Sequence, residues 1–464
     1  MNSITETNQQ IDALFHPESI AIVGLPREMK TGKLYLLALR DLGYKGKIVG
    51  VNPKADEIDG VICYPTVAAI PDKIDLAIVL TPHHHTLPVI EECAEKGVKG
   101  VILFTAGYKE SGTEEGAQRQ EEIVKIARRT GMRIIGPNGM GLYAPESGVS
   151  FFPNLSRVSG PISLISHSGS LANIICGIGV SRGLFFNKAV SLGNECDLTS
   201  TDFLNYYADD PNTKIISGYI EGISEGTHFK QALINAAQKK PVIIWKVGLN
   251  PSGLAAANSH TGALSSPKEI WDGIVAQSGV TPVVGFEMWA DTMVGFSLLP
   301  ESKGDRIAII SGPGGLAVSA AEAVGRENLK MAQISDETRS FLETVVPPTG
   351  TSLKNPIDVG LTASLEINIY IKSIQAVAND PGVDTVLVIG IGMDADSNKR
   401  LSESIINTQQ ETGKPFLVVE VPNIQNDFSP IFAKAGIPYF QSSDKALGVY
   451  SRVYQYYQRH SSDN

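Results

Sequence analysis

The sequence predicts an α/β protein whose sheets are mainly parallel and whose chain forms about three domains. Short apolar runs alternate with helical patterns throughout, as in β-α-β units. Part of the chain also repeats itself, with the segments in the same order. A length of 464 residues allows about three domains at roughly 150 residues each, and 42% hydrophobic with 19% charged residues is an ordinary globular composition.

The first domain is predicted over residues 1–145. Its candidate strands end in small or turn residues and follow one another at about 25 to 30 residues, the spacing of a strand with a crossover helix. These strands are 20–24, 47–51, 76–80, 100–104 and 133–135. Ligands bind at the carboxyl ends of strands in open α/β sheets, so this domain is predicted to bind a nucleotide-type ligand there.

The rest of the chain contains an internal repeat, which predicts two similar flavodoxin-like domains at about 146–300 and 301–464. The matching segments are 162–172 with 307–317, 193–198 with 354–359, 209–223 with 379–393, and 239–247 with 413–421. The second of these matches aligns Asp197 with Asp358.

The two copies differ in one insertion. The first copy continues into 248–266, which is rich in Gly, Ala and Ser and contains His260, whereas the second copy has nothing equivalent. An insertion in one copy alone is where function is expected, and this composition predicts a flexible loop.

Both repeats open with small residues between a buried strand and a helical run. Such a turn leaves backbone N–H groups open at a helix N-terminus, where anions bind. The alternative is a tight strand–helix connection that needs Gly for its backbone alone. Because the turns are paired, we expect both helix ends to point at one phosphate. The predicted phosphate-binding residues are Ser168, Gly169, Ser170, Gly312, Gly314 and Gly315.

His260 and Glu221 are the candidate catalytic residues. Glu221 ends a strongly apolar strand, where a carboxylate is costly unless it is paired. It could accept the Nδ1–H of His260 and leave Nε2 as the nucleophile. The alternatives are a solvated strand-end acid and an ordinary surface histidine. The histidine run 83–85 follows a strand end, and three adjacent histidines cannot all face one metal from a strand, so no metal site is predicted.

Composition excludes several classes of function. A net charge of −10 argues against a nucleic-acid or anionic-membrane surface. The four cysteines are scattered, which is typical of buried thiols in a reducing cytosol. The N-terminal residues have no secretory pattern and no apolar run reaches the roughly 18 residues of a membrane span, so a cytoplasmic protein is expected. Residues 24–34 have the wrong spacing for a P-loop and do not match G-x-G-x-x-G.

Taken together, the motifs resemble the alpha subunits of the nucleoside-diphosphate-forming acyl-CoA synthetases, a family that includes ADP-forming acetyl-CoA synthetase and is related to succinyl-CoA synthetase. The likeness covers nearly the whole chain. The motifs are PESIAIVG (17–24), VNPK (51–54), DLAIVLTP (75–82), FTAGYKESG (104–112), GPNGMG (136–141), SHSGSL (166–171), SLGNECD (191–197), SHTGAL (259–264) and NPIDV (355–359).

The resemblance implies a Rossmann-like coenzyme A (CoA) binding domain followed by two flavodoxin-like domains of the succinyl-CoA synthetase type. It implies that His260 is transiently phosphorylated beside Glu221 and that the two turns cradle the phosphate. By the same likeness, the residues near CoA are Gly24, Lys33, Pro53, Lys54, Thr81, Pro82, Thr105, Ala106, Gly107, Pro137 and Asn138.

Members of this family also need an ATP-grasp module that holds Mg²⁺ and ADP or ATP. No part of this chain is predicted to form one, so the resemblance implies a separate beta subunit and an α₂β₂ complex. Three positions depart from the family pattern. Gly139 stands where Cys is common, His167 replaces the Gln of an S-Q-S-G turn, and the run 83–85 is unusual.

Two other functions are compatible with parts of this sequence. A non-catalytic CoA-binding or regulatory protein could retain the same fold, but the intact SHTGAL segment and Glu221 argue against it. A dinucleotide-dependent oxidoreductase could use the first domain alone, but it would leave the repeats without a role and lacks the expected glycine motif.

Overall fold

The computed structural model describes residues 3–261, 267–348, 352–421 and 427–461, without the side chains of 258–261 and 461. The chain divides into two compact units, Met1–Ile178 with Phe185–Val284 and Gly179–Leu184 with Gly285–Asn464. The first two predicted domains therefore share one unit, and their limits at 145 and 300 stay predictions. Within the described residues no helix combines the length and apolar character needed to span a bilayer.

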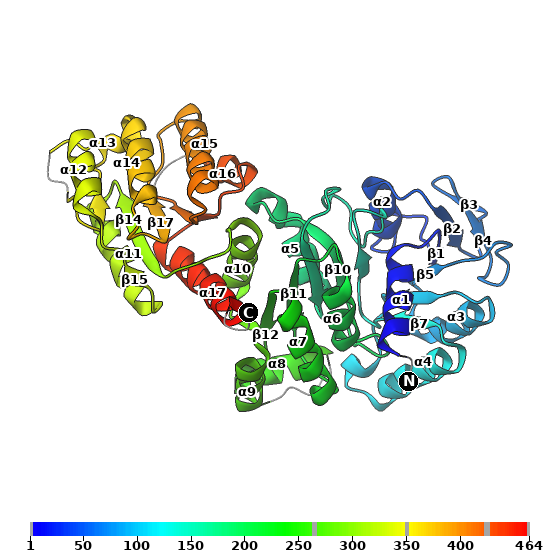
Figure 1. The fold of residues 1–464 in the computed structure, drawn as a ribbon. Coiled ribbons are helices and arrows are strands. Elements are labelled where there is room, and N and C mark those ends of the chain that lie inside the picture. The colour runs from blue at the N-terminus through cyan, green and yellow to red at the C-terminus, as the bar shows by residue number, and fades with distance from the viewer. Residues whose placement is uncertain (1–2, 262–266, 349–351, 422–426, 462–464) are drawn as a thin grey trace. The chain divides into compact units, whose positions relative to one another are not determined.

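The first sheet has the strand order β3-β4-β2-β1-β5-β6-β7, and all of its pairings are parallel except that of β3 with β4. Its strands are β1 (Ser19–Val23), β2 (Lys47–Val51), β3 (Glu57–Ile58), β4 (Val61–Tyr64), β5 (Leu76–Val79), β6 (Gly100–Leu103) and β7 (Arg133–Ile135). Its helices are α1 (Ile4–Phe15), α2 (Lys33–Leu42), α3 (His83–Glu95), the 3-10 turn η1 (Lys109–Ser111) and α4 (Glu114–Thr130). The five predicted strands are confirmed to within one residue. Figure 1 shows this part of the chain in blue and cyan.

The second sheet has the order β13-β12-β11-β9-β10-β8, with β8 antiparallel to β10. Its strands are β8 (Gly141–Tyr143), β9 (Ile162–Ser166), β10 (Phe186–Ser191), β11 (Ile215–Ile220), β12 (Val242–Lys246) and β13 (Thr281–Val283). The helices of this region are α5 (Gly169–Ile178), α6 (Ser200–Asp209), α7 (Gly226–Lys239), α8 (Pro251–Thr261) and α9 (Lys268–Ser278).

The second unit contains the third sheet, of order β15-β14-β17-β18-β19, with β16 also paired to β14. Its strands are β14 (Arg306–Ser311), β15 (Lys330–Met331), β16 (Ile357–Asp358), β17 (Thr385–Ile389), β18 (Phe416–Val419) and β19 (Tyr439–Phe440). Its helices are the 3-10 turn η2 (Gly179–Arg182), α10 (Phe286–Leu298), α11 (Gly314–Arg326), α12 (Asp336–Val345), α13 (Thr362–Leu365), α14 (Asn368–Asn379), α15 (Ala395–Thr412), α16 (Ser429–Lys434) and α17 (Ser443–Ser461).

The internal repeat is visible in the strand order and in the register of pairing. The series β10-β9-β11-β12-β13 and β15-β14-β17-β18-β19 both follow the flavodoxin order 2-1-3-4-5. Ile162 pairs with Ile215 in the first copy, and the aligned residues Ile307 and Thr385 pair in the second. Three of the four matching segments therefore occupy equivalent places in the two sheets.

The match of Asp197 with Asp358 was wrong. In the second copy Asp358 pairs with Ser311, whereas in the first copy the residue that pairs with the corresponding Ser166 is Ser191. In the second copy the separate strand β16 occupies this place, and it follows helix α12 in the chain. Asp197 instead accepts hydrogen bonds from Arg133 Nε at 2.9 Å and from the Ile134 N–H at 2.8 Å, which fastens it to the first sheet.

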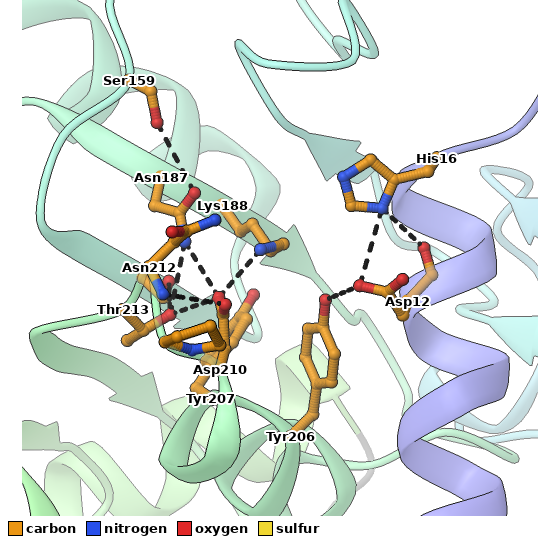
Figure 2. Close-up of polar contacts among 12 residues, drawn as sticks. Asp12, His16, Ser159, Asn187, Lys188, Tyr206, Tyr207, Asp210, Asn212 and Thr213 are labelled. Carbon is orange, nitrogen blue, oxygen red and sulfur yellow. Dashed lines mark hydrogen bonds and ion pairs between the residues drawn. The ribbon is translucent and has the colours of Figure 1, made fainter.

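Helix α1 also joins the first and second sheets within one unit. Its last residue, Phe15, stacks on Tyr206 of α6 with ring centroids 5.9 Å apart and meets Phe203 edge-on at 6.2 Å. The Tyr206 hydroxyl donates to the Asp12 carboxylate at 2.7 Å, as Figure 2 shows. These aromatic contacts are buried and hold the two sheets as one body.

Candidate functional site

The carboxyl edge of the first sheet brings four of the predicted CoA residues side by side. Gly24 follows β1 with φ +84° and lies against Thr81, which follows β5. The Thr105 hydroxyl donates to the Thr81 carbonyl at 2.6 Å, and the Asn138 N–H donates to the Thr105 carbonyl at 3.0 Å. The Thr81 hydroxyl is buried and has no hydrogen-bond partner among the described residues. A buried unsatisfied hydroxyl at the ligand edge of an α/β sheet fits a bound polar ligand.

The other predicted CoA residues differ in their burial and in their contacts. Lys33 lies buried in the first turn of α2 with its Nζ 2.7 Å from the Asp59 carboxylate, so it is an ion-paired cation. Gly107 is half-buried and its Cα faces the His83 ring. Pro53, Lys54, Pro82 and Ala106 are exposed, and Pro137 is buried.

Two of the unusual positions have local explanations. A Cβ built on Gly139 would lie 2.7 Å from the Ser191 carbonyl oxygen, so the close backbone of the second sheet leaves no room there for the Cys of the family pattern. His83, His84 and His85 form the first turn of α3, and His84 and His85 are exposed. Among the described residues no group of three or more His, Cys, Asp and Glu side chains is arranged to hold a metal ion.

The two predicted phosphate turns have the same local structure. The Ser166 hydroxyl donates to the Ser168 carbonyl at 2.7 Å, and the aligned Ser311 hydroxyl donates to the Pro313 carbonyl at 2.9 Å. Helices α5 and α11 begin at the next residue in each copy. Of the predicted residues, Ser168, Gly169 and Gly314 are half-buried, Ser170 and Gly315 are exposed, and Gly312 is buried. Each turn therefore presents a helix N-terminus that suits an anion.

Glu221 is buried at the carboxyl end of β11, with 4% of its surface exposed. Lys246, at the end of the adjacent strand β12, is also 4% exposed and donates from Nζ to the Glu221 carbonyl at 2.8 Å. The Val247 N–H donates to the Ile220 carbonyl at 3.1 Å. The chain that leads from β12 into α8 therefore starts directly beside Glu221.

His167 lies on the other side of Glu221 and is likewise buried. Its Nδ1 accepts the Glu221 N–H at 3.2 Å, while its Nε2 lies 2.9 Å from the Ser200 hydroxyl and 3.0 Å from the Glu195 carboxylate. Because Nδ1 accepts a hydrogen bond, the neutral imidazole carries its proton on Nε2. Glu195 also accepts the Ser200 N–H at 2.7 Å, so its carboxylate is well satisfied.

The local pKa shifts reflect this burial. Desolvation lowers the pKa of Lys246 to about 8, although the charge of Glu221 opposes the shift. Burial, followed by the charge of the Glu221 carboxylate and a hydrogen bond to it, raises the pKa of Tyr219. Burial tends to raise the pKa of Glu195, but the charge of His167 and its hydrogen bond, together with those of Ser200, outweigh this effect and lower it. Several ionisable groups at this edge of the second sheet therefore have pKa values that their surroundings shift.

The expected flexible loop at 248–266 is a helix over much of its length. Helix α8 spans Pro251–Thr261 and begins where the Asn250 side chain accepts the Gly253 N–H at 2.8 Å. An Asn N-cap, a Pro in the first turn and an Ala run are strong helix signals. The prediction of a flexible loop considered only the content of small residues and gave these signals too little weight. Helix α8 packs against η1 of the first sheet's domain. His260 is the tenth residue of this helix, and its side chain lies outside the described residues.

Sequence reasoning missed Lys246 and Glu195. The signal for Lys246 was available, because two neighbouring apolar strands of a parallel sheet end in opposite charges, Glu221 and Lys246. The signal for Glu195 was weaker, because its place depends on a backbone with φ +52° that only the tertiary structure requires.

Two family descriptions match successive parts of the chain. "CoA binding domain" covers residues 18–145, and "Succinyl-CoA ligase like flavodoxin domain" covers 159–296.

Full-length relatives and a solved structure carry related names. The alpha subunit of ADP-forming acetate–CoA ligase I from Pyrococcus furiosus is 33% identical over 96% of this chain and 97% of its own length. The ADP-forming 4-hydroxybutyrate–CoA ligase of Nitrosopumilus maritimus is 30% identical over 94% of this chain and 62% of its own length. The dinucleotide-forming acetyl-coenzyme A synthetase 1 of Ca. Korarchaeum cryptofilum, in complex with phosphate and ADP, matches with a TM-score of 0.86 and 30% identity over 97% of both chains.

Proposed function

The chain belongs to the ADP-forming acyl-CoA synthetase family, and from that premise we propose that it is the CoA-binding alpha subunit of such an enzyme. The proposed reaction interconverts acyl-CoA, ADP and phosphate with a carboxylic acid, CoA and ATP. The acyl group is proposed to be small, and the names of the relatives include both acetate and 4-hydroxybutyrate.

The observation that carries this proposal is the buried Glu221 between the Ser168 turn and the segment that leads to His260. This carboxylate is 4% exposed and lies at the ligand edge of the sheet, where it could orient an imidazole. Val247, the residue that leaves β12, is hydrogen-bonded to Ile220, so the His260 segment is anchored one residue away from Glu221.

The proposed chemistry has three steps. A phosphate oxygen attacks the acyl carbon of the thioester, the C–S bond breaks, and CoA leaves as the thiol. Nε2 of His260 then attacks the phosphorus of the acyl phosphate, and the carboxylate leaves. In the last step the phosphoryl group passes from His260 to ADP. In each step the protein contributes positioning and charge stabilisation, which is most of what phosphoryl transfer requires.

The residues have separate roles in this scheme. The amides at the start of α5 and of α11 stabilise the negative charge on phosphate. Glu221 accepts the Nδ1–H of His260, which fixes the tautomer and stabilises the imidazolium that forms. Gly248, with φ +77° between β12 and α8, supplies a hinge at which the His260 segment turns between two sites.

We further propose that a separate ATP-grasp beta subunit holds Mg²⁺ and the nucleotide, in an α₂β₂ complex. This chain covers 97% of a relative that is named as an alpha subunit, but only 62% of the longer Nitrosopumilus maritimus enzyme. The difference is consistent with a further module that the longer relative carries in one chain.

The test is to incubate the purified chain with acetyl-CoA and radiolabelled phosphate and to follow label on the protein. We expect acid-labile, base-stable label on the wild type and none on His260→Ala. His228→Ala is the matched control, because His228 is an exposed histidine paired with Glu225 at 2.7 Å and should leave labelling unchanged. Label that persists in His260→Ala would remove this residue from the mechanism.

Glu221→Gln tests the second catalytic residue. It keeps the size and backbone of Glu221 but removes its charge, so labelling should slow by roughly 100-fold or more. A wild-type rate in this variant would return Glu221 to a structural role. CoA binding without any labelling, even when an ATP-grasp subunit is supplied, would favour the non-catalytic alternative.

A further inference from the structure

Three polar residues distinguish the first repeat from the second at the same edge of the sheet. The matched strand registers place His167, Glu221 and Lys246 where the second copy has Gly312, Ile391 and Glu420. All three residues of the first copy are buried, with 5%, 4% and 4% of their surface exposed. Of the three second-copy residues only Glu420 is charged, and it is half-buried. Since burial of charged and polar side chains is costly, the buried set of three in the first copy points to a task that this copy performs.

Two of these side chains hold the peptide groups of the third. Nδ1 of His167 accepts the Glu221 N–H at 3.2 Å, and Nζ of Lys246 donates to the Glu221 carbonyl at 2.8 Å. Lys246 Nζ also donates to the Val247 carbonyl at 2.5 Å. The backbone of Glu221 is therefore clamped on both sides by side chains from β12 and from the turn after β9.

Further residues support the His167 ring, which holds the Glu221 N–H. Nε2 of His167 faces the Glu195 carboxylate at 3.0 Å and the Ser200 hydroxyl at 2.9 Å, which fix the ring and its tautomer. The result is a line of hydrogen bonds from Glu195 through His167 and Glu221 to Lys246 across four neighbouring strands. Fixing the Glu221 backbone fixes the direction of its Cα–Cβ bond and hence the region that its carboxylate can reach.

We propose that His167 and Lys246 are positioning residues that hold Glu221 in the orientation it needs to accept a hydrogen bond from the His260 imidazole. The inference rests on the proposed function, because it assigns these residues to the phosphohistidine step. A catalytic group must be held to within about 0.5 Å of its productive geometry, and its supporting shell provides that precision. In this protein the support acts through the backbone of Glu221.

The first experiment compares two lysines that the structure makes a matched pair. Lys246 and Lys240 stand near opposite ends of β12, each donates to two backbone carbonyls, and burial lowers the pKa of each to about 8. Only Lys246 holds Glu221. With radiolabelled acetyl phosphate as the phosphoryl donor, Lys246→Met should lower the maximal labelling rate of the chain about 10- to 100-fold with the half-saturating acetyl phosphate concentration unchanged. Lys240→Met should label within about twofold of the wild type.

The second experiment works from the other side of Glu221 and serves if Lys246→Met fails to fold. His167→Leu removes the acceptor for the Glu221 N–H and should slow labelling to a similar extent. His167→Gln keeps one acceptor and one donor, so it should restore most of the rate.

The outcomes separate the two proposals. Wild-type rates in both Lys246→Met and His167→Leu, with Glu221→Gln still slow, would overturn the positioning role and leave the proposed function in place. A rate in His167→Gln as low as that in His167→Leu would also count against it. If neither acetyl phosphate nor acetyl-CoA with phosphate labels the wild type, the proposed function fails and takes the positioning role with it.

Discussion

The buried ion pair of Lys188 and Asp210 lies at the amino end of the second sheet, away from the proposed chemistry, and its removal should be costly. Nζ of Lys188 lies 2.8 Å from the Asp210 carboxylate, and the two side chains are 3% and 6% exposed. The same carboxylate accepts from the Asn187 side chain at 2.9 Å and from the Thr213 hydroxyl at 2.7 Å, as Figure 2 shows. Asp210→Ala would therefore leave a buried ammonium and two further donors without their acceptor.

The magnitude follows from that geometry. Breaking one side of a buried ion pair typically costs about 3–5 kcal/mol, because the remaining charge stays desolvated. The double variant Lys188→Met with Asp210→Leu removes the unpaired charge but still leaves the Asn187 and Thr213 donors without this acceptor, so it should be about 1–2 kcal/mol more stable than Asp210→Ala and less stable than the wild type. The neighbouring pair Asp209–Lys239 is about half-exposed on both sides, and Asp209→Ala should cost less than about 1 kcal/mol.

The pH dependence has a definite sign. Burial tends to raise the pKa of Asp210, but the hydrogen bonds from Lys188 and Thr213 outweigh it, so its pKa is lowered in the folded protein. A carboxyl with a lowered pKa contributes stability that is present above its unfolded pKa, about 3.9, and is lost as the pH falls through the lower folded value. This part of the acid sensitivity should be absent in Asp210→Ala.

Urea unfolding at neutral pH, followed by tryptophan fluorescence, measures these differences, and hydrogen exchange of β10 and α6 assigns them to the second sheet. A loss of less than about 1 kcal/mol in Asp210→Ala would refute the reasoning. So would a double variant that is no more stable than the single one, because the cost would then not come from an unpaired charge.

Three further variants test local backbone arguments. Gly193 has φ +56°, and a Cβ there would lie 2.2 Å from the Pro137 carbonyl oxygen, so Gly193→Ala should cost about 2 kcal/mol or more in urea unfolding. Gly273→Ala, in the open interior of α9, should instead gain about 0.5–1 kcal/mol, and equal effects of the two would contradict the steric account. Asn250→Ala removes the acceptor for the Gly253 N–H and should weaken α8 by about 1 kcal/mol, seen as faster amide exchange near Gly253; unchanged exchange would show that this cap does not hold the helix.

Much of the framework could be predicted from the sequence because it depends on local pattern. The apolar runs of the first domain became strands within one residue of the predicted limits, since continuous apolar runs at the spacing of β-α-β units have few other solutions. The repeat predicted two sheets of the same topology, and the pairings Ile162–Ile215 and Ile307–Thr385 confirm that the aligned positions are equivalent. The resemblance to the acyl-CoA synthetase family is also confirmed.

The remaining features could not be predicted because they depend on which strands are neighbours in the sheet, or because loop-forming and helix-forming residues occur in the same segment. In the sequence Lys246 is only a lysine at the end of a strand. Its Nζ can donate to the Glu221 carbonyl because β11 and β12 are neighbours in the sheet. Segment 248–266 contained both loop-like and helix-like residues, and the Asn250 cap with the alanines of α8 favoured the helix. Asp197 and Asp358 looked equivalent in a short match, but Arg133 in another sheet fixes the first of them.

The duplication explains why the proposed site is asymmetric. Both copies keep the serine that closes the turn before the helix, Ser166 and Ser311, and an amide-lined helix end needs no more than that backbone to attract an anion. A single phosphorylated histidine needs only one orienting carboxylate, and Ile391 stands in the second copy where Glu221 stands in the first. Ile391 is 1% exposed, and the residues that correspond to His167 and Lys246 beside it are Gly312 and Glu420, which offer a carboxylate no cationic or donor side chain. Ile391→Glu should therefore cost about 3 kcal/mol or more in urea unfolding, because it buries a carboxylate without the support that Glu221 has. An unchanged unfolding midpoint would show that the asymmetry has another origin.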